Sequence, residues 1–306
     1  MWTSRGYRFR KPDWSQKWRK KTLIRANVPP SRGIRHSGCD DAGRFRCDHH
    51  RFGTDEWGFA HLPCCPVSLR ERILVPERMD APDLPRREHD EALRGLARLN
   101  RISRADGMLW RFLAPRLATL PPGGRLRILD VATGSGDVPI RLSQRARRRF
   151  PDARIEWAAC DVSEHALDTA TRRARAIDLD LQTHRLDVTS DPLPENDVTI
   201  CSLFLHHLET SQVIGLLERM AESATTGIVI SDLERTRTGL FLAHLAAHCF
   251  SRSPVVHFDA PASVRAAFTR PELVELAHRA GLNALGITRV FPQRMILDWS
   301  ASGATG

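Results

Sequence analysis

Residues 127–137 read Arg-Ile-Leu-Asp-Val-Ala-Thr-Gly-Ser-Gly-Asp, and this stretch decides the fold. The apolar residues on both sides of Asp130 predict a buried strand. Gly134 and Gly136 predict a tight turn that lets the backbone approach a ligand, because glycine has no Cβ. Residues 138–150 follow with a helical pattern, and amides in the first turn of such a helix suit an anionic group. We therefore predict a strand, a glycine loop and a helix that together hold a ligand.

The spacing of the glycines excludes two common nucleotide-binding loops. A dinucleotide-binding loop needs a small residue where this chain has Pro139. A P-loop needs a lysine, and no lysine follows Lys21. An acidic residue, Asp130, four positions before a Gly-x-Gly is what remains. This arrangement resembles the first motif of class I S-adenosylmethionine (SAM) dependent methyltransferases. Residues 130–137 are most similar to the group that contains the ubiquinone and menaquinone biosynthesis methyltransferases. The wider family usually has glycine in place of Ala132, a departure that this group tolerates.

The rest of the chain alternates between strand and helix patterns, which predicts an α/β fold with a mostly parallel sheet and helices on both faces. The resemblance implies a Rossmann-like methyltransferase fold with seven strands, an antiparallel hairpin at the C-terminal end and a helical cap before the first strand. Thr269 and Glu272 form a predicted capping box. The expected elements are a cap over 85–120, strands at 155–160, 179–186, 197–203 and 227–230, helices at 164–176, 209–223 and 240–250, and a hairpin of 283–290 and 294–299.

Acidic residues close the predicted strands, where an open α/β sheet binds its ligand. Asp161 follows the second strand and is placed to accept hydrogen bonds from ribose hydroxyls. Asp187 and Val188 follow the third strand, where the resemblance implies contacts with adenine. SAM is therefore the expected cofactor. The expected cofactor-binding residues are Asp130, Ala132, Thr133, Gly134, Gly136, Asp161, Val162, Asp187, Val188 and Leu203.

Three histidines are candidates for a catalytic base. His206 and His207 follow the fourth strand, which in the resembled family ends beneath the transferable methyl group. His257 lies after the fifth strand, in a segment that usually lines the acceptor site. Histidine can accept a proton near neutral pH, although methyl transfer from a sulfonium depends mainly on alignment. The same two histidines after the fourth strand could instead serve only as the floor of the cofactor pocket.

The N-terminal quarter differs from the rest in charge. Residues 1–78 hold 17 Lys and Arg against 8 Asp and Glu, whereas residues 79–306 hold 29 against 28. We interpret residues 1–78 as a disordered extension, or as residues before a true start at Met79, and residues 79–306 as the methyltransferase domain. A basic nucleic-acid arm is a less favoured reading. The cysteines and histidines at 39, 47, 49, 50, 64 and 65 match no common zinc spacing, so we expect no metal.

These observations predict an enzyme that transfers a methyl group from SAM to oxygen or carbon of a small aromatic, phenolic or quinone-like acceptor. The alternatives are a nucleic-acid methyltransferase that uses the basic arm and a SAM-binding protein without turnover. Buried cysteines, the lack of a secretory signal and the lack of a long apolar run predict a cytoplasmic protein without a transmembrane segment. Nucleic acid is a disfavoured partner, because the basic excess belongs to the first quarter alone.

Overall fold

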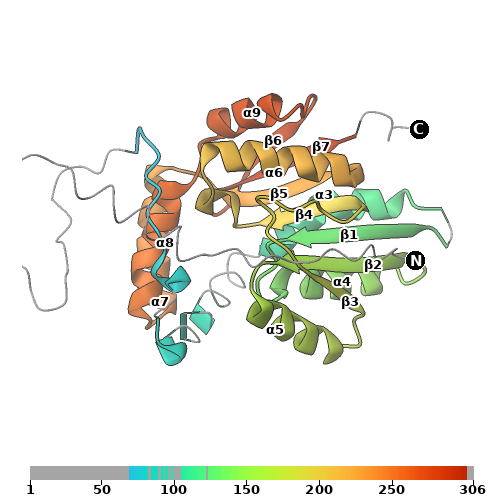
Figure 1. The fold of residues 1–306 in the computed structure, drawn as a ribbon, viewed down its shortest axis with the longest axis horizontal. Helices are drawn as coiled ribbons and strands as arrows, with labels where there is room; N and C mark the ends of the chain where they lie inside the picture. The colour runs from blue at the N-terminus through green and yellow to red at the C-terminus, as the bar shows by residue number, and fades with distance from the viewer. Residues whose placement is uncertain are drawn as a thin grey trace, which may run out of the picture. The chain divides into compact units, whose positions relative to one another are not determined.

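The computed structural model describes residues 69–301 except 82–83, 89–90, 93, 96–97, 99–104 and 122. The described residues form one seven-stranded sheet (Figure 1) with the strand order β3-β2-β1-β4-β5-β7-β6. Strands β1 to β5 are mutually parallel, and β7 runs antiparallel to both β5 and β6. The strands are β1 (Arg125–Val131), β2 (Arg154–Asp161), β3 (Leu181–Arg185), β4 (Asn196–Ser202), β5 (Ala224–Leu233), β6 (Gly286–Val290) and β7 (Arg294–Ser300).

This topology confirms the predicted Rossmann-like fold and its antiparallel C-terminal hairpin. The chain moves outward from β1 through β2 to β3, then returns to the other side of β1 for β4 and β5. The strand order therefore reverses next to β1, and such a reversal opens a crevice at the C-terminal ends of the strands. The loop that the sequence singled out, residues 132–136, lies directly after β1 at this crevice.

Side-chain alternation along β1 explains why helices cover both faces of the sheet. Ile128 packs in one apolar cluster with residues of α3, α4 and α5. Leu129 and Val131 pack in the other, with residues of α6 and α9. Successive side chains of a strand point to opposite faces of the sheet. A strand with apolar side chains on both faces therefore needs a helical layer on each. The helices are α3 (Ala105–Ala118), α4 (Asp137–Arg149), α5 (Glu164–Arg175), α6 (Thr210–Ser223), α7 (Arg237–Phe250), α8 (Pro254–Ala266) and α9 (Arg270–Arg279).

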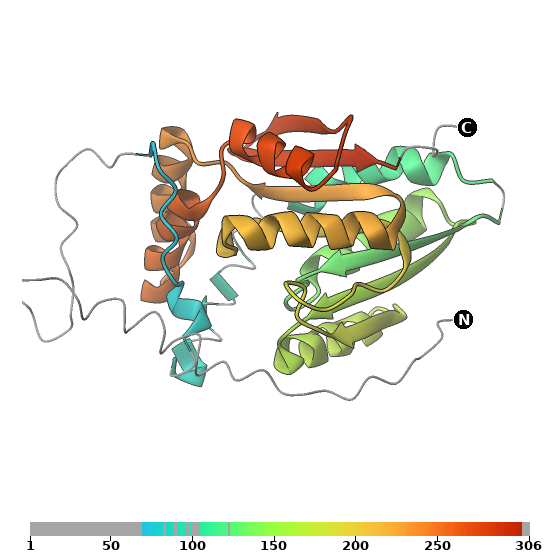
Figure 2. The same ribbon diagram turned by 45° about the horizontal axis from the view of Figure 1, so that its top comes forward.

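Helices α7 and α8 form a separate layer beyond the C-terminal ends of the parallel strands (Figures 1 and 2). The apolar helix expected at 240–250 is α7, but α8 was not predicted. Pro254 occupies the first turn of α8, where proline is favourable, whereas Pro261 lies inside the helix, where proline normally argues against one. Val255 and Val256 bury against Ala247 of α7, so packing outweighs the local propensity.

The described chain before α3 also belongs to this layer. Residues 69–77 and the short 3-10 helix η2 (Arg78–Asp80) run along α8 (Figure 2). Arg72 donates to the carbonyl oxygens of His206 at 2.9 Å and Leu208 at 2.7 Å. Contacts of the domain therefore begin before Met79, at least from Leu69, whose carbonyl accepts from Arg235. Residues 1–68 lie outside the described part of the chain, so the predicted extension, the alternative basic arm and the Cys and His residues at 39–65 are not tested.

The expected helical cap divides into two parts. Residues 86–88, 91–92, 94–95 and 98 are helical, but the five apolar positions that predict this helix (93, 96, 97, 99 and 102) lie outside the described residues. The second part is α3, which packs against the sheet through Leu109 and Leu113. Its Arg116 pairs with Asp298 of β7 at 2.7 Å. In the described chain, no helix combines the length and apolar character needed to cross a membrane.

Candidate active site

The glycine loop after β1 is bound to the end of β2. The Gly134 amide donates to Oδ2 of Asp161 at 2.8 Å, and the Ser163 amide donates to Oδ1 at 2.9 Å. The Thr133 amide donates to the Cys160 carbonyl at 3.0 Å. The Asp161 carboxylate thus fixes the loop relative to the helix that begins after it, α5. Because a carboxylate can accept several hydrogen bonds, Asp161 retains capacity for a ligand.

The backbone of this loop is left-handed at three positions. Ala132 has φ 54°, Gly134 has φ 55° and Gly136 has φ 74°. Left-handed backbone is costly for alanine, which agrees with glycine being usual at this position in the wider methyltransferase family. A Cβ at Gly136 would lie 2.8 Å from Cβ of Ala170, whereas a Cβ at Gly134 would meet no described atom within 4 Å. Gly136 therefore allows the loop to pack on α5, and Gly134 faces space that a ligand can occupy.

Asp130 lies beneath the loop with 2% of its surface exposed. Burial raises the pKa of its carboxyl group to about 7, and the nearby Asp161 adds to the rise. Thr133 donates to Oδ2 of Asp130 at 2.6 Å, which partly opposes it by stabilising the charged form. The carboxyl group of Asp130 therefore changes charge near neutral pH, where a cationic ligand would favour its ionised form.

An ion pair between α4 and α5 also holds the glycine loop. Arg173 of α5 donates to Asp137 at 2.6 Å and to the Ser135 carbonyl oxygen at 2.9 Å. Burial acts to raise the pKa of Asp137, but the pair with Arg173 outweighs it and the pKa is lowered. The first residue of α4 is therefore a carboxylate, and its charge is matched by Arg173.

Asp187 and Val188 follow β3, as the sequence predicted, but the Asp187 carboxylate is partly engaged. Its Oδ1 accepts from the Thr189 amide at 2.9 Å and from the Thr189 hydroxyl at 2.7 Å. Val188 is buried, and its carbonyl oxygen accepts from Arg219 at 2.8 Å. These contacts give the residues after β3 a defined conformation, and their proposed role toward adenine stays a prediction.

Beyond β4 the chain turns into the short 3-10 helix η3 (Leu205–His207), which brings two imidazoles together. Leu203 begins this turn in a left-handed conformation, with φ 57°. Nδ1 of the buried His206 lies 2.6 Å from Oδ1 of Asp232, and the His206 amide donates to the same carboxylate at 3.2 Å. Burial acts to lower the pKa of His206, but Asp232 outweighs it and raises that pKa, while the pKa of Asp232 is lowered. The bond assigns the proton to Nδ1 and the lone pair to Nε2 in the neutral ring.

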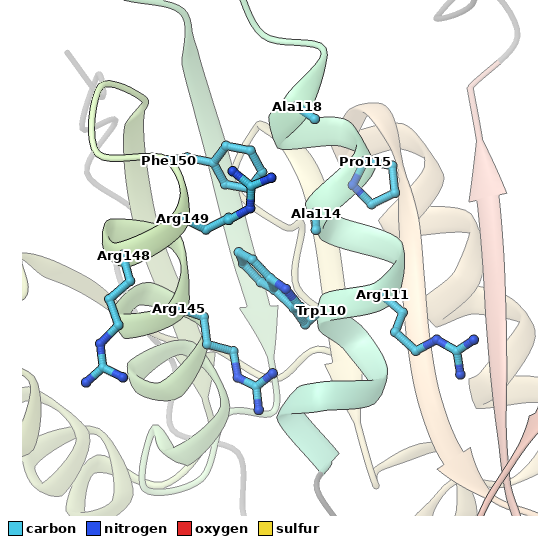
Figure 3. Close-up of a pocket in the computed structure, with 9 residues that line it drawn as sticks. All are labelled: Trp110, Arg111, Ala114, Pro115, Ala118, Arg145, Arg148, Arg149 and Phe150. Carbon is cyan, nitrogen blue, oxygen red and sulfur yellow. The ribbon is translucent and has the colours of Figure 1, made fainter.

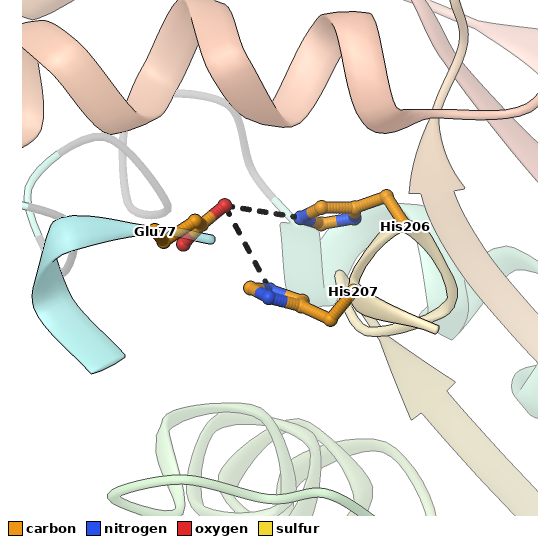
Figure 4. A group of neighbouring side chains, drawn as sticks. All are labelled: Glu77, His206 and His207. Atoms are coloured by element: carbon orange, nitrogen blue, oxygen red, sulfur yellow. Dashed lines mark ion pairs between the residues drawn. The ribbon is translucent and has the colours of Figure 1, made fainter. Parts of the chain in front are cut away.

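His207 and Glu77 complete a cluster with His206 (Figure 4). Oε1 of Glu77 lies 3.9 Å from Nε2 of His206 and 3.9 Å from Nε2 of His207. Ser263 of α8 donates a short hydrogen bond to the same Glu77 oxygen. Burial, with the neighbouring His206, lowers the pKa of His207 to about 4, so this imidazole is neutral at physiological pH.

The third predicted catalytic residue, His257, does not join this cluster. Its Nε2 lies 2.8 Å from the Ser251 carbonyl oxygen, and its ring stacks on His248 with 4.2 Å between centroids. These partners belong to α7 and the turn that leads to α8. The structure therefore brings together two of the three predicted histidines, and His257 helps to hold α7 against α8.

A basic and aromatic groove lies away from the C-terminal ends of the parallel strands. It lies between α3 and the C-terminal part of α4 (Figure 3). Trp110 and Phe150 form its apolar wall, and the arginines at 111, 145, 148 and 149 surround them. Since α4 begins at the glycine loop and ends at this groove, the two sites are at opposite ends of the helix. The groove is separate from the candidate active site.

Two residues beside the histidines, Asp232 and Glu77, were not predicted as site residues. Asp232 lies next to the last residue of β5, and β5 pairs with β4, so strand order alone could have placed Asp232 beside His206. Glu77 lies in the segment that was interpreted as an extension, and no local pattern marks it. Its position depends on contacts between residues 69–80 and α8, which a local sequence pattern does not reveal.

Comparison with known proteins agrees with this geometry. Residues 128–227 match a family model described as a methyltransferase domain. That interval begins in β1 and ends in β5, so it includes the glycine loop, Asp161 and the two histidines. A search of curated proteins found no match to this chain.

Solved structures with the same fold include several methyltransferases. The SAM-dependent methyltransferase SibL is 18% identical, with a TM-score of 0.51, over 72% of this chain and 59% of SibL. A proposed O-methyltransferase from Nostoc punctiforme is 15% identical, with a TM-score of 0.51, over 75% of this chain and 64% of that protein. The plantazolicin methyltransferase BpumL is 15% identical, with a TM-score of 0.52, over 70% of this chain and 89% of BpumL.

The match therefore spans less than two thirds of SibL and of the Nostoc protein. At these identities the likeness concerns the fold, and the family model concerns the part of the chain that carries the glycine loop. Residues 128–227 therefore match a methyltransferase domain, and the described sheet shares its fold with solved methyltransferases.

Proposed function

We propose that this protein transfers the methyl group of SAM to an oxygen or carbon atom of a small aromatic, phenolic or quinone-like acceptor. The observation that carries the proposal is the bond between the Gly134 amide and Asp161, which holds the glycine loop open beside a carboxylate. A carboxylate at this place can accept from the two ribose hydroxyls, and the loop leaves room for the ligand at Gly134. SAM supplies an activated methyl group on a sulfonium, and the residues of this chain bind and orient it.

The residues at the C-terminal ends of β4 and β5 activate the acceptor. The cofactor loop after β1 and the histidines after β4 occupy the ends of adjacent parallel strands. His206, supported by Asp232, is a stronger base than an isolated imidazole, whereas His207 is a weaker one. An acceptor hydroxyl placed against this pair would lose its proton more readily than in water, and the oxygen would then attack the methyl carbon.

A small acceptor is also consistent with what lies over the site. Helices α7 and α8 and residues 69–80 close the strand ends, so the acceptor must fit beneath a helical layer. BpumL was solved with a desmethyl-plantazolicin analogue and S-adenosylhomocysteine, so a protein of this fold can hold a cofactor product and an acceptor analogue at once. The similarity of residues 130–137 to the quinone-biosynthesis group favours a quinone-like or phenolic acceptor. A cytoplasmic location stays a prediction.

Calorimetric titration of the full chain with S-adenosylhomocysteine and, separately, with NADH tests the cofactor assignment. We expect binding of the former alone, and at least about tenfold weaker binding for Asp161→Ala, since one lost charged hydrogen bond corresponds to about 1.4 kcal/mol or more. Asp152→Ala is the matched control, because Asp152 is exposed in the turn before β2. Tight NADH binding, or equal affinity of both variants for S-adenosylhomocysteine, would contradict the proposal.

A further inference from the structure

The cluster of Glu77, His206 and His207 has the composition of a metal site. One ligand atom of each residue lies within 4.8 Å of the other two. Two imidazoles and one carboxylate are a recurrent ligand set for divalent transition metals, and catalytic zinc sites of this kind keep further positions open. We propose that this cluster binds one divalent transition-metal ion, with Zn²⁺ as the reference ion.

The distances suit a shared ion better than direct bonds between the side chains. Glu77 is 3.9 Å from each imidazole nitrogen, which is too long for a hydrogen bond. Two ligand atoms on a tetrahedral zinc ion lie about 3.4 Å apart, given bonds of about 2.1 Å. A contraction of about half an ångström in each of the two Glu77 distances would therefore match the spacing of ligands on one ion.

Hydrogen bonds from neighbouring side chains already orient two of the three ligands. The Asp232 carboxylate holds Nδ1 of His206 at 2.6 Å, which directs the Nε2 lone pair toward Glu77. A histidine that binds a metal through one nitrogen commonly donates from the other to a carboxylate. Ser263 similarly orients the Glu77 oxygen. If burial were the only role of these side chains, His206 and Glu77 would not both need hydrogen bonds that orient their facing atoms.

Burial of the cluster shows where a further ligand would enter. The side chains of His206 and Glu77 are 5% and 10% exposed, whereas that of His207 is 28% exposed. An added ligand can therefore reach the ion from the His207 side. Imidazole ligands favour Zn²⁺, Cu²⁺, Fe²⁺ or Ni²⁺ over Mg²⁺, Ca²⁺ and Mn²⁺, which prefer oxygen.

The role of the ion in turnover rests on the proposed function, whereas its binding does not. A hydroxyl group of the acceptor bound to the ion would lose its proton to solvent, and the oxygen would form a bond to the methyl carbon as the carbon–sulfur bond breaks. S-adenosylhomocysteine would leave with the electron pair of that bond. Metal binding at Nε2 of His206 would replace proton acceptance by the same nitrogen, so a metal requirement separates the two ways of activating the acceptor.

Zinc titration of the full chain, with the cysteines of residues 1–65 changed to serine, tests the site. We expect one Zn²⁺ per chain, at least about 100-fold weaker binding for Glu77→Gln and for His207→Phe, and about tenfold weaker binding for Asp232→Asn. His165→Phe is the matched control, because His165 is exposed on α5. The absorption of bound Co²⁺ provides a second readout of the same site, and it should disappear in Glu77→Gln.

Two results would overturn the inference. The first is no zinc binding by the parent protein, which requires no folded variant to interpret. The second is unchanged zinc affinity in both ligand variants. If the protein binds S-adenosylhomocysteine but not zinc, the proposed function stands and the metal inference fails. If it binds zinc but not S-adenosylhomocysteine, the metal inference stands and the proposed function fails.

Discussion

The buried carboxyl group of Asp130 predicts an unusual dependence of stability on pH. Its pKa is raised from an ordinary value of 3.8 to about 7. Between these values the unfolded chain is ionised at this position while the folded chain keeps the proton. The stability that the neutral form provides is therefore complete below about pH 4, and it is lost as the pH rises to about 7. Asp130→Asn should remove this loss, since asparagine is uncharged and keeps an oxygen for Thr133.

The size of the effect follows from the two pKa values. Because the unfolded chain ionises at this position more readily than the folded chain, Asp130 lowers the free energy of unfolding by about 2 kcal/mol at pH 5 and about 4 kcal/mol at pH 8, relative to a residue that cannot ionise. The free energy of unfolding of Asp130→Asn should therefore gain about 2–3 kcal/mol on the parent protein between pH 5 and pH 8. The sign is opposite to that of an ordinary paired carboxylate, which stabilises the folded chain as the pH rises.

Urea unfolding of the full chain, followed by circular dichroism at four pH values from 5 to 8, measures this difference. Asp137→Asn is the matched control, because the pKa of Asp137 is lowered and its contribution is constant above about pH 5. If the parent protein and Asp130→Asn give parallel curves, the reasoning about burial of Asp130 is refuted.

Two further predictions concern the loop and the N-terminal segment. Gly136→Ala should destabilise the protein by at least about 1 kcal/mol more than Gly281→Ala, because both have positive φ but only Gly136 has a neighbour, Ala170, at 2.8 Å from the added Cβ. Equal losses in urea unfolding would contradict this. Arg72→Ala should cost about 2–4 kcal/mol by leaving buried carbonyl oxygens without a donor, while the exposed Arg86→Ala should cost little. An Arg72 variant as stable as the Arg86 variant would show that residues 69–80 do not depend on these contacts.

The sequence predicted the sheet well because its signals are local. The apolar residues around Asp130 mark β1, and Ser163 caps α5 by accepting from the Ala166 amide at 3.3 Å. The capping box of Thr269 and Glu272 was also confirmed. Strand ends moved by one to three residues, and the largest change was β5, which extends to Ala224–Leu233.

Prediction was weaker where long-range contacts decide the structure. Helix α8 forms despite Pro261, since its valines bury against α7. Asp161 and the glycines at 134 and 136 could be placed from strand and loop patterns. Glu77 could not be placed beside His206, because Glu77 and its partner Ser263 lie in segments that carry no recognisable motif.

The cofactor side and the acceptor side of the site are held by different sets of contacts, so substitutions should affect them separately. The cofactor side is built from loops that follow β1 and β2, and its bonds join Gly134, Asp161 and Ser163 within a short stretch of chain. The acceptor side needs Arg72 to hold the backbone of η3, and Glu77 to face the histidines. Because these supports share no hydrogen bond with the glycine loop among the described contacts, substitutions on the acceptor side should leave affinity for S-adenosylhomocysteine largely intact. Loss of turnover with unchanged cofactor binding is therefore the expected signature of the acceptor side. A variant at Glu77 that lost both would mean that residues 69–80 and the cofactor loop are energetically coupled.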